Sequence, residues 1–347
     1  MVPVFKTDES FRAPFHYSNS PAAIRRFPFP FDQDTFMYSV NAEPHLPGPV
    51  GSCCEFPIDI DEHYLGECRE REIVLAADTD RCLALPHMIT AQWDVLELIM
   101  THLAHDYPDH FELRRDGNHW RWINRALGRD DHFTFGDVTT LPQEPLEYMT
   151  RQTQGDWCIL DQRNDSLWLD AGMVTTQADW SLNFNLGMNF REWHSPVPLA
   201  SELGVFDRAL KLLMNLRQGS PVRRLNWSMT IHPRLDTSPE QFPVWGPDRT
   251  SVTPQNVGEI LHLRVELQAL WRLPRSNAIV FSIRGYLINL RELVTVPKWG
   301  RRLHRVLKNM HPALIAYKGL RRYHETAVTW LADYDDGNST TPGTQPD

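Results

Sequence analysis

The sequence predicts an α+β protein built on an antiparallel sheet, with helices inserted after the second strand of that sheet. Three observations between residues 151 and 290 lead to this fold class. Two strand-like segments joined by a turn come first, a stretch with an amphipathic helix follows, and three further strand-like segments come last. Apolar residues recur with a period of about 2 in strands and about 3.6 in helices, so the two kinds of segment are separable by pattern.

The first 150 residues are expected to form an arm and a mixed region that pack on this core. Residues 1–60 are rich in proline and phenylalanine, which predicts an extended arm around the body, because disordered tails carry few aromatic residues. Residues 64–77 are expected to be helical, and a second helix should follow Pro86. Its apolar residues recur at helical spacing: Ile89, Trp93, Leu96, Met100 and Leu103. The stretch RRDGNHW predicts a hairpin turn.

Residues 151–290 are expected to contain the core. The segment DWCILDQRNDSLWLDAGMV predicts a strand, a turn and a second strand. The segment ELGVFDRALKLLMNLRQG predicts an amphipathic helix with Gly219 as its stop signal. Three strand candidates follow: VRRLNWSMTI, LHLRVELQALWRL and NAIVFSIRGYLI. A PAS-type module has this order of elements, and other α+β folds share it.

The end of the chain divides into two parts. Residues 291–334 are expected to form C-terminal helices, because basic and apolar residues recur there at helical spacing. The polar tail DDGNSTTPGTQPD, residues 335–347, is expected to be disordered.

Charge and composition exclude several classes of protein. The 347 residues carry a formal net charge of −9 and the isoelectric point is about 5.9, which argues against a nucleic-acid partner. Neither a signal peptide nor a run of about 18 apolar residues is present, so we expect a cytoplasmic protein without membrane contact. The five cysteines lack the spacing of a zinc or iron–sulfur site, and their odd number favours free thiols. Any iron–sulfur chemistry would then reside on a partner.

Two of the strand candidates carry polar residues at alternate positions. On the longer strand these residues share one face: His262, Arg264, Glu266, Gln268 and Arg272. On the shorter strand they are Arg224, Asn226, Ser228 and Thr230. If the strands are neighbours, both polar faces must lie on the same side of the sheet. Such a face is either solvated or lines a site with a guanidinium and a carboxylate for a small charged ligand, and the pattern leaves both open.

The stretch NFREWHSPVP places His194 directly before a Ser-Pro-Val-Pro segment. Because proline fixes its own φ, lacks an N–H and disfavours helix in the residue before it, the chain must turn there and the imidazole has a defined direction. That position suits a metal or haem ligand, and it equally suits an ordinary helix-end residue. The residue pattern does not decide between them.

Four motifs occur in a specific order along the chain: WHSPVP, PVRRLNW, RVELQALWRLPRSNAIVFSIRGY and YKGL. The usual nucleotide-binding, hydrolase and zinc-protease motifs are absent. The four motifs resemble the α subunit of the haem-dependent oxidative N-demethylases. The resemblance covers about residues 55–335, and it is specific in the second half and loose in the first.

The resemblance implies a PAS-like fold that binds haem b. It implies that an N-methyl group of a small amine such as dimethylamine is oxidised with dioxygen, releasing formaldehyde and the demethylated amine. Electrons from NADPH would arrive through partner subunits that carry FMN and a 2Fe–2S cluster, and tetrahydrofolate on a partner would collect the formaldehyde. We therefore expect a monooxygenase-type oxidoreductase that works in a hetero-oligomer with a flavin and iron–sulfur reductase and a folate-binding subunit.

The same resemblance implies roles for single residues. His194 would be the axial ligand of the haem iron. Arg224 would be a distal arginine that donates hydrogen bonds to dioxygen, and Glu266 would hold the substrate ammonium, so these two form the expected catalytic pair. Trp180 would lie beside the substrate. The other cofactor-binding positions implied are Asn226, Arg264, Gln268, Arg272, Arg284 and Lys318, of which the last three are candidates to pair with haem propionates.

Two interpretations compete with the demethylase. A haem-PAS oxygen or gas sensor would use the same iron ligand without turnover, although these 347 residues show no kinase, cyclase or DNA-binding output domain. A cofactor-free interaction protein would use His194 as a plain helix-end residue.

Two departures bear on the resemblance. Trp193 stands where the family tends to carry a smaller aliphatic residue. Residues 181–190 alternate in a way that predicts a strand, whereas the resemblance implies helical turns there, which we expect.

Overall fold

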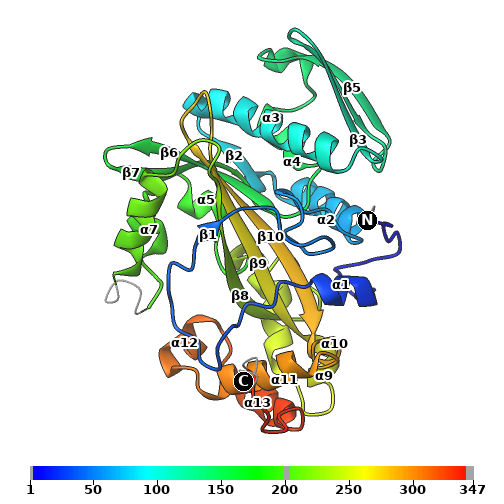
Figure 1. Ribbon diagram of the computed structural model, residues 1–347, viewed down its shortest axis with the longest axis vertical. Helices are drawn as coiled ribbons and strands as arrows, with labels where there is room; N and C mark the ends of the chain where they lie inside the picture. Colours follow the sequence, from blue (N-terminus) through cyan, green and yellow to red (C-terminus); the bar gives the residue numbers. More distant parts are fainter. Residues whose placement is uncertain (1–2, 199–203, 341–347) are drawn as a thin grey trace, which may run out of the picture.

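A seven-stranded sheet runs through the middle of the computed structural model, which describes residues 3–198 and 204–340 (Figure 1). Every pairing in this sheet is antiparallel. From one edge to the other the strands are β1 (Glu43–Pro44), β8 (Val222–Ile231), β9 (Leu261–Arg272), β10 (Ile279–Asn289), β6 (Asp156–Arg163), β7 (Ser166–Met173) and β2 (Cys82–Ala84). The predicted α+β class with an antiparallel sheet is confirmed, and the five strands expected in the core all form.

The central strand β9 is buried over its whole length. Apolar and polar side chains alternate along β9, so one face of the strand is apolar and the other is polar, and both faces are buried. Leu263, Val265 and Leu267 pack into an apolar core on one face of the sheet, while Arg264, Glu266 and Gln268 point to the other face. A shift of the register by one residue would exchange these faces, so the apolar core fixes which way the polar residues point.

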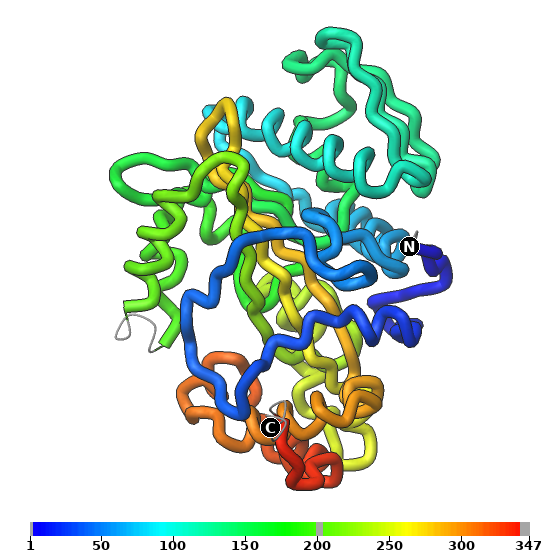
Figure 2. The backbone as a smooth tube through the Cα atoms, in the orientation of Figure 1, coloured from blue at the N-terminus to red at the C-terminus, as the bar shows by residue number. Residues whose placement is uncertain are grey.

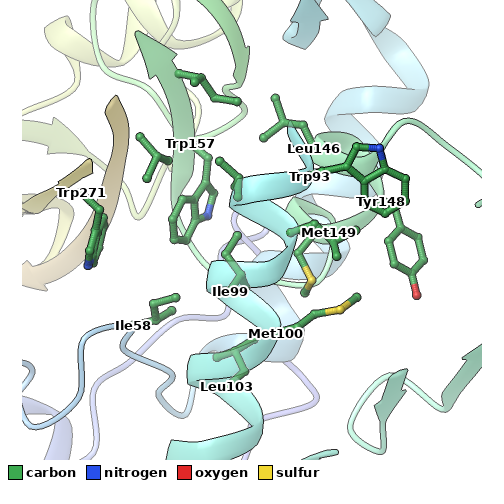
Figure 3. Packing of buried hydrophobic residues seen from close by; sticks show 14 of the residues in the cluster. Ile58, Trp93, Ile99, Met100, Leu103, Leu146, Tyr148, Met149, Trp157 and Trp271 are labelled. Atoms are coloured by element: carbon green, nitrogen blue, oxygen red, sulfur yellow. The ribbon is translucent and has the colours of Figure 1, made fainter. Parts of the chain in front are cut away.

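The N-terminal helices are α1 (Pro21–Arg26), α2 (Tyr64–Ala77), α3 (Ile89–Asp106) and α4 (Pro145–Thr150). The expected helices over residues 64–77 and after Pro86 are thereby confirmed. Figure 3 shows the apolar face of α3 directed at the sheet, with Ile99 near Trp157 of β6. Trp271 of β9 stacks near Trp157, with ring centroids 6.3 Å apart, which joins this cluster to the sheet.

A second, three-stranded sheet projects from α3 at the top of Figure 1. Its strands are β3 (Phe111–Asp116), β4 (His119–Asn124) and β5 (Arg129–Thr134). The expected hairpin turn joins β3 to β4, where Gly117 adopts a φ of +55° that favours glycine.

Helices follow β7, as the fold class predicts, and further short helices follow β8, where no helix was expected. Those between β7 and β8 are α5 (Leu182–Asn185), α6 (Phe190–His194) and α7 (Val205–Met214), and those between β8 and β9 are α8 (Phe242–Trp245) and α9 (Val257–Ile260). Residues 181–190 thus form helical turns rather than the strand that alternation alone predicts, because Ser181 caps α5 and Gly187 turns the chain at a φ of +81°. The first residues of the segment expected to form α7 lie outside the described residues.

The C-terminal helices are α10 (Leu290–Leu293), α11 (Pro297–Lys308), α12 (Pro312–Tyr317) and α13 (His324–Ala332). The expectation of a disordered tail needs correction for residues 335–340. Asp335 pairs with Arg305 of α11 at 2.6 Å, and Thr340 accepts a hydrogen bond from Arg302. Acidic and polar tail residues are held there by the arginines of α11, while residues 341–347 lie outside the described part.

The N-terminal arm crosses one face of the sheet as an extended strap, which we define as residues 27–57 (Figure 2). Phe27, Phe31 and Cys53 of the strap pack in the same core as Trp227 and Val265. Apolar burial therefore holds the strap in place, as the aromatic residues of this region predicted. Division of the chain into domains at residues 150 and 290 stays a prediction. Among the described residues, no helix combines the length and apolar composition that a membrane span requires.

At Gly155, directly before β6, the backbone approaches β10 so closely that it leaves no space for a side chain. Its φ is +76°, and a Cβ there would lie 2.4 Å from the carbonyl oxygen of Ile283, whereas Gly117 has a positive φ with open space around it. Gly155→Ala should therefore lower the free energy of unfolding by about 3 kcal/mol, and Gly117→Ala by about 1 kcal/mol, because only the first adds a backbone clash to the left-handed strain. Urea denaturation measures both, and equal losses would contradict this account.

Candidate active site

The candidate site lies on the polar face of β8 and β9. Three polar pairs stand directly opposite each other across these strands: Arg224 with Gln268, Asn226 with Glu266, and Ser228 with Arg264. Paired residues of antiparallel strands point to the same side of a sheet. The inference that the two polar faces coincide, drawn for neighbouring strands, is confirmed.

Glu266 is the centre of this face, and its carboxylate is buried. Asn226 Nδ2 donates to Glu266 Oε2 at 3.2 Å, and Gln268 Nε2 donates to the same oxygen at 3.0 Å. Glu266 Oε1 faces Arg264 Nε at 3.7 Å. Opposite Glu266 on β10 stands Gly285, where an added Cβ would meet nothing within 4 Å. The carboxylate is therefore oriented by two amides and has open space beside it.

Two cations lie near this carboxylate. Arg224 Nε donates to Asn41 Oδ1 of the strap at 3.0 Å, and desolvation lowers the pKa of Arg224 while the charge of Glu266 opposes that shift. Lys318, directly after α12, donates to the carbonyl oxygen of Trp227 at 2.5 Å and lies over its indole ring. Burial lowers the pKa of Lys318 to about 8, although Glu266 acts in the other direction. Glu266 is thus the anion that balances two partly desolvated cations.

His194 is the last residue of α6, as the Ser-Pro-Val-Pro segment indicated. A capping box between Asn189 and Glu192 starts this helix. His194 Nδ1 donates to the carbonyl oxygen of Phe190 at 2.8 Å, which places the ring proton on Nδ1 because a carbonyl only accepts. Within the described residues, Nε2 makes no hydrogen bond.

The electrostatic surroundings keep this imidazole neutral. Desolvation lowers the pKa of His194 to about 4, and the charge of Arg224 adds to that shift. At neutral pH Nε2 therefore carries a lone pair, and the positive charge of Arg224 disfavours protonation of the ring. An Nδ1–H bound to a backbone carbonyl is the usual support of a histidine that ligates a metal through Nε2.

Aromatic rings surround His194. The centroids of Phe190, Trp193 and Phe206 lie 4.3, 5.0 and 5.4 Å from that of His194. Trp180 extends the wall, because its ring lies 5.4 Å from that of Trp193. The bulky Trp193, a departure from the family pattern, is thus an integral part of the wall. Such a wall suits a planar, largely apolar ligand.

Three arginines expected to contact the cofactor are engaged elsewhere. Arg284 lies on the opposite face of the sheet, where it pairs with Asp61 at 2.7 Å and Glu67 at 2.9 Å. The sheet therefore separates the guanidinium of Arg284 from the polar face, and a role of Arg284 in cofactor binding stays a prediction that these contacts do not support.

Arg272 and Arg264 lie on the polar side of the sheet, but most of their N–H groups already donate to other protein atoms. All five N–H groups of Arg272 are used, by Gln162 and by four backbone carbonyls around the end of α7 and the β9–β10 turn. A pairing of Arg272 with a haem propionate stays a prediction that these contacts do not support. Arg264 donates to the carbonyls of Leu235 and Thr176, so it ties two loops to β9 and lies beside Glu266.

Two residues of the site were missed by the sequence reasoning. Asn41 holds Arg224 and also donates to the carbonyl of Leu225 at 2.8 Å. It lies in an irregular strap, where no periodicity marks it. Asp179 adopts a φ of +62°, and its charge acts on Lys318. Burial raises the pKa of Asp179. Its position directly before Trp180 is the one available signal.

These features place a neutral imidazole on the same side of the sheet as the polar face that carries Arg224 and Glu266. A family model described as haem-dependent oxidative N-demethylase, alpha subunit-like, matches residues 54–328. The matched range is most of the chain and includes His194, Arg224, Glu266 and Lys318. The chain belongs to this family, whose description makes it a haem-dependent oxidoreductase and a subunit of a larger enzyme.

The residues present fit haem. His194 offers a neutral Nε2 as the ligand atom, and the rings around it offer an apolar wall for the macrocycle. Lys318 is a buried cation near the polar face, whereas all donors of Arg272 are engaged and Arg284 lies on the opposite face of the sheet. Asn41 of the strap, which holds Arg224, lies outside the matched range.

The balance of charge around Glu266 can be tested without any cofactor. Glu266→Gln leaves Arg224 and Lys318 without their common anion, so it should lower the free energy of unfolding by about 2 kcal/mol. Glu259→Gln removes an exposed carboxylate that pairs with Arg291 at 2.7 Å and should leave stability unchanged within error. Chemical denaturation compares the two variants, and an unchanged or increased stability of Glu266→Gln would refute the role of its charge.

Proposed function

We propose that this chain is the haem b-binding subunit of a monooxygenase-type oxidative N-demethylase for a small methylated amine. The proposed reaction converts dimethylamine to methylamine and formaldehyde with dioxygen and electrons from NADPH. The observation that carries the proposal is the neutral His194, whose Nε2 makes no hydrogen bond within the described residues, on the same side of the sheet as the polar face with Arg224 and the buried Glu266.

The proposed role of His194 is to hold the haem iron through Nε2. When bound, the haem would supply the reductive activation of dioxygen. The protein's contribution on this side is to keep the imidazole unprotonated and its ring fixed, through burial and the hydrogen bond to Phe190. Arg224 would present donor N–H groups to dioxygen, because Asn41 accepts from its Nε and leaves its terminal nitrogens for a ligand.

Glu266 would bind the substrate ammonium. A desolvated alkylammonium needs a nearby anion, and dimethylammonium has two N–H donors that a carboxylate can accept. Asn226 and Gln268 both donate to Oε2, so the substrate would bind at Oε1, where Arg264 Nε lies 3.7 Å away, beyond hydrogen-bonding distance. The absence of a side chain at Gly285 leaves room for a small amine and disfavours a bulky one. Trp180 and Trp193 would exclude water and contact the methyl groups.

Electrons would have to come from partner subunits. Within the described residues, no group of three cysteines converges in the way that an iron–sulfur cluster requires. The proposal therefore places FMN and the 2Fe–2S cluster on a reductase partner and tetrahydrofolate on a formaldehyde-collecting partner. A cytoplasmic location agrees with free thiols and with a supply of NADPH.

Haem binding through His194 is tested by absorption. His194→Ala, expressed with ample haem, should lose or strongly shift the Soret band of the wild-type protein, because the ligand atom is removed. His262 is the matched control: its Nδ1 also faces a backbone carbonyl, of Ile260, and its pKa is also lowered to about 4 by burial, but it lies at the far end of β9. His262→Ala should keep the band. A wild-type protein without haem, or equal spectra for both variants, would overturn the assignment.

Turnover separates an enzyme from a gas sensor. Wild-type protein with haem, dimethylamine and an electron donor should release formaldehyde. Glu266→Gln should lower kcat/KM by about 100-fold, mostly through KM, because it removes the anion that binds the ammonium. A bound haem with no formaldehyde would favour the sensor interpretation, and an unchanged KM in Glu266→Gln would contradict the substrate role of Glu266.

A further inference from the structure

Two adjacent cysteines of the strap lie in direct contact, away from the polar face. The Sγ atoms of Cys53 and Cys54 are 3.7 Å apart, within hydrogen-bonding distance for sulfur. Cys53 is buried against the apolar core, whereas Cys54 is partly exposed. The loop that carries them is held closed, because Gly48 donates its N–H to the carbonyl of Cys54 at 2.6 Å. The two thiols are therefore presented as a fixed pair.

The two thiols differ in acidity. The hydrogen bond from Cys53 lowers the pKa of Cys54, and the charge of Arg223 acts in the same direction. The same hydrogen bond, together with burial, raises the pKa of Cys53. Arg223 is itself held in place, since it pairs with Glu43 at 2.7 Å and donates to the carbonyl of Leu46 at 2.9 Å. Cys54 is therefore the nucleophile of the pair, and Cys53 is the resolving thiol beside it.

We propose that Cys53 and Cys54 are a reversible redox pair that hydroperoxides oxidise to a vicinal disulfide. The Cys54 thiolate attacks one peroxide oxygen, the O–O bond breaks, and the other oxygen leaves as water after protonation. The Cys53 sulfur then attacks the Cys54 sulfenic acid, the S–O bond breaks, and the hydroxyl leaves as water with the Cys53 proton. In total, two thiols and one hydrogen peroxide give one disulfide and two water molecules.

The geometry makes the oxidised form easy to reduce. Neighbouring Cα atoms are about 3.8 Å apart, below the separation of about 4.4–6.8 Å at which disulfides usually form. A disulfide between adjacent residues is therefore strained, and strained disulfides are the labile, regulatory kind. In a reducing compartment the dithiol is the resting form, and all five cysteines are free in the structure.

The cysteine pair lies in the strap, and the same strap contacts two neighbouring arginines of β8. Cys54 lies near Arg223, which pairs with Glu43 where β1 meets β8, so oxidation changes the surroundings of this ion pair. The next residue, Arg224, is held by Asn41 of the same strap. The existence of the redox pair rests on the sulfur geometry and does not depend on haem binding or on the demethylase activity.

The test uses the full-length protein and hydrogen peroxide at one equivalent. Free thiols are counted under denaturing conditions, and mass spectrometry gives the mass of the peptide that contains residues 53 and 54. Wild-type protein should lose two thiols of its five, and that peptide should lose two hydrogen masses without any intermolecular link. A reductant such as dithiothreitol should restore both thiols. This measurement needs no variant, so it does not depend on how substitutions affect folding.

Variants then assign the roles of the two sulfurs. In Cys53→Ser, Cys54 should stop at a sulfenic acid that dimedone traps, and in Cys54→Ser no thiol should be lost over the same time. Cys82 is the matched control, since it is also partly buried but has a raised pKa and no thiol neighbour. Cys82→Ser should still form the disulfide. Oxidation of the wild type to sulfinic acid alone, or of Cys82 as fast as Cys54, would overturn the proposal.

Discussion

The register of β8 on β9 is the constraint on which the site depends. Because β9 is buried on both faces, its apolar residues must meet the core under the strap, and its polar residues must meet the other side. Glu266 is thus placed in the interior by the hydrophobic burial of its strand neighbours. A buried carboxylate is costly unless it is hydrogen-bonded and paired, and Asn226, Gln268 and the nearby cations meet both needs. One pairing choice therefore sets the position, the charge and the hydrogen bonds of the residue proposed to bind the amine.

His194 reaches the same face by an independent route. Its helix is only five residues long, so its position depends on the capping box, the contact with Phe190 and the aromatic cluster that packs on the sheet. Because the Nδ1–H is committed to a backbone carbonyl, Nε2 remains a lone-pair donor, and burial keeps it so at neutral pH. The family to which the chain belongs is described as haem-dependent, and this imidazole is the ligand that we propose for the cofactor.

Much of the fold followed from periodicity, and the exceptions have physical reasons. The strands β6 to β10 and the helices α2 and α3 carry long patterns with period 2 or 3.6, so the sequence located them, and the shared polar face of β8 and β9 followed from the same patterns. Residues 181–190 broke the rule because a cap and a glycine turn, which act locally, override alternation in a short segment. The ion pairs of Arg284 could not be predicted because its partners Asp61 and Glu67 are more than 200 residues away in sequence, and no local pattern indicates such pairing. Asn41 was missed for the same reason, since its contact with Arg224 depends on the path of the strap across the sheet and not on a local pattern.

The most direct test of the site is the iron–histidine stretching band in the resonance Raman spectrum of the ferrous, haem-loaded protein. If His194 Nε2 holds the iron, the band should be present in the wild-type protein, absent in His194→Gly, and restored when free imidazole is added to that variant. A wild-type spectrum without the band, or a band that survives unchanged in His194→Gly without imidazole, would contradict the account.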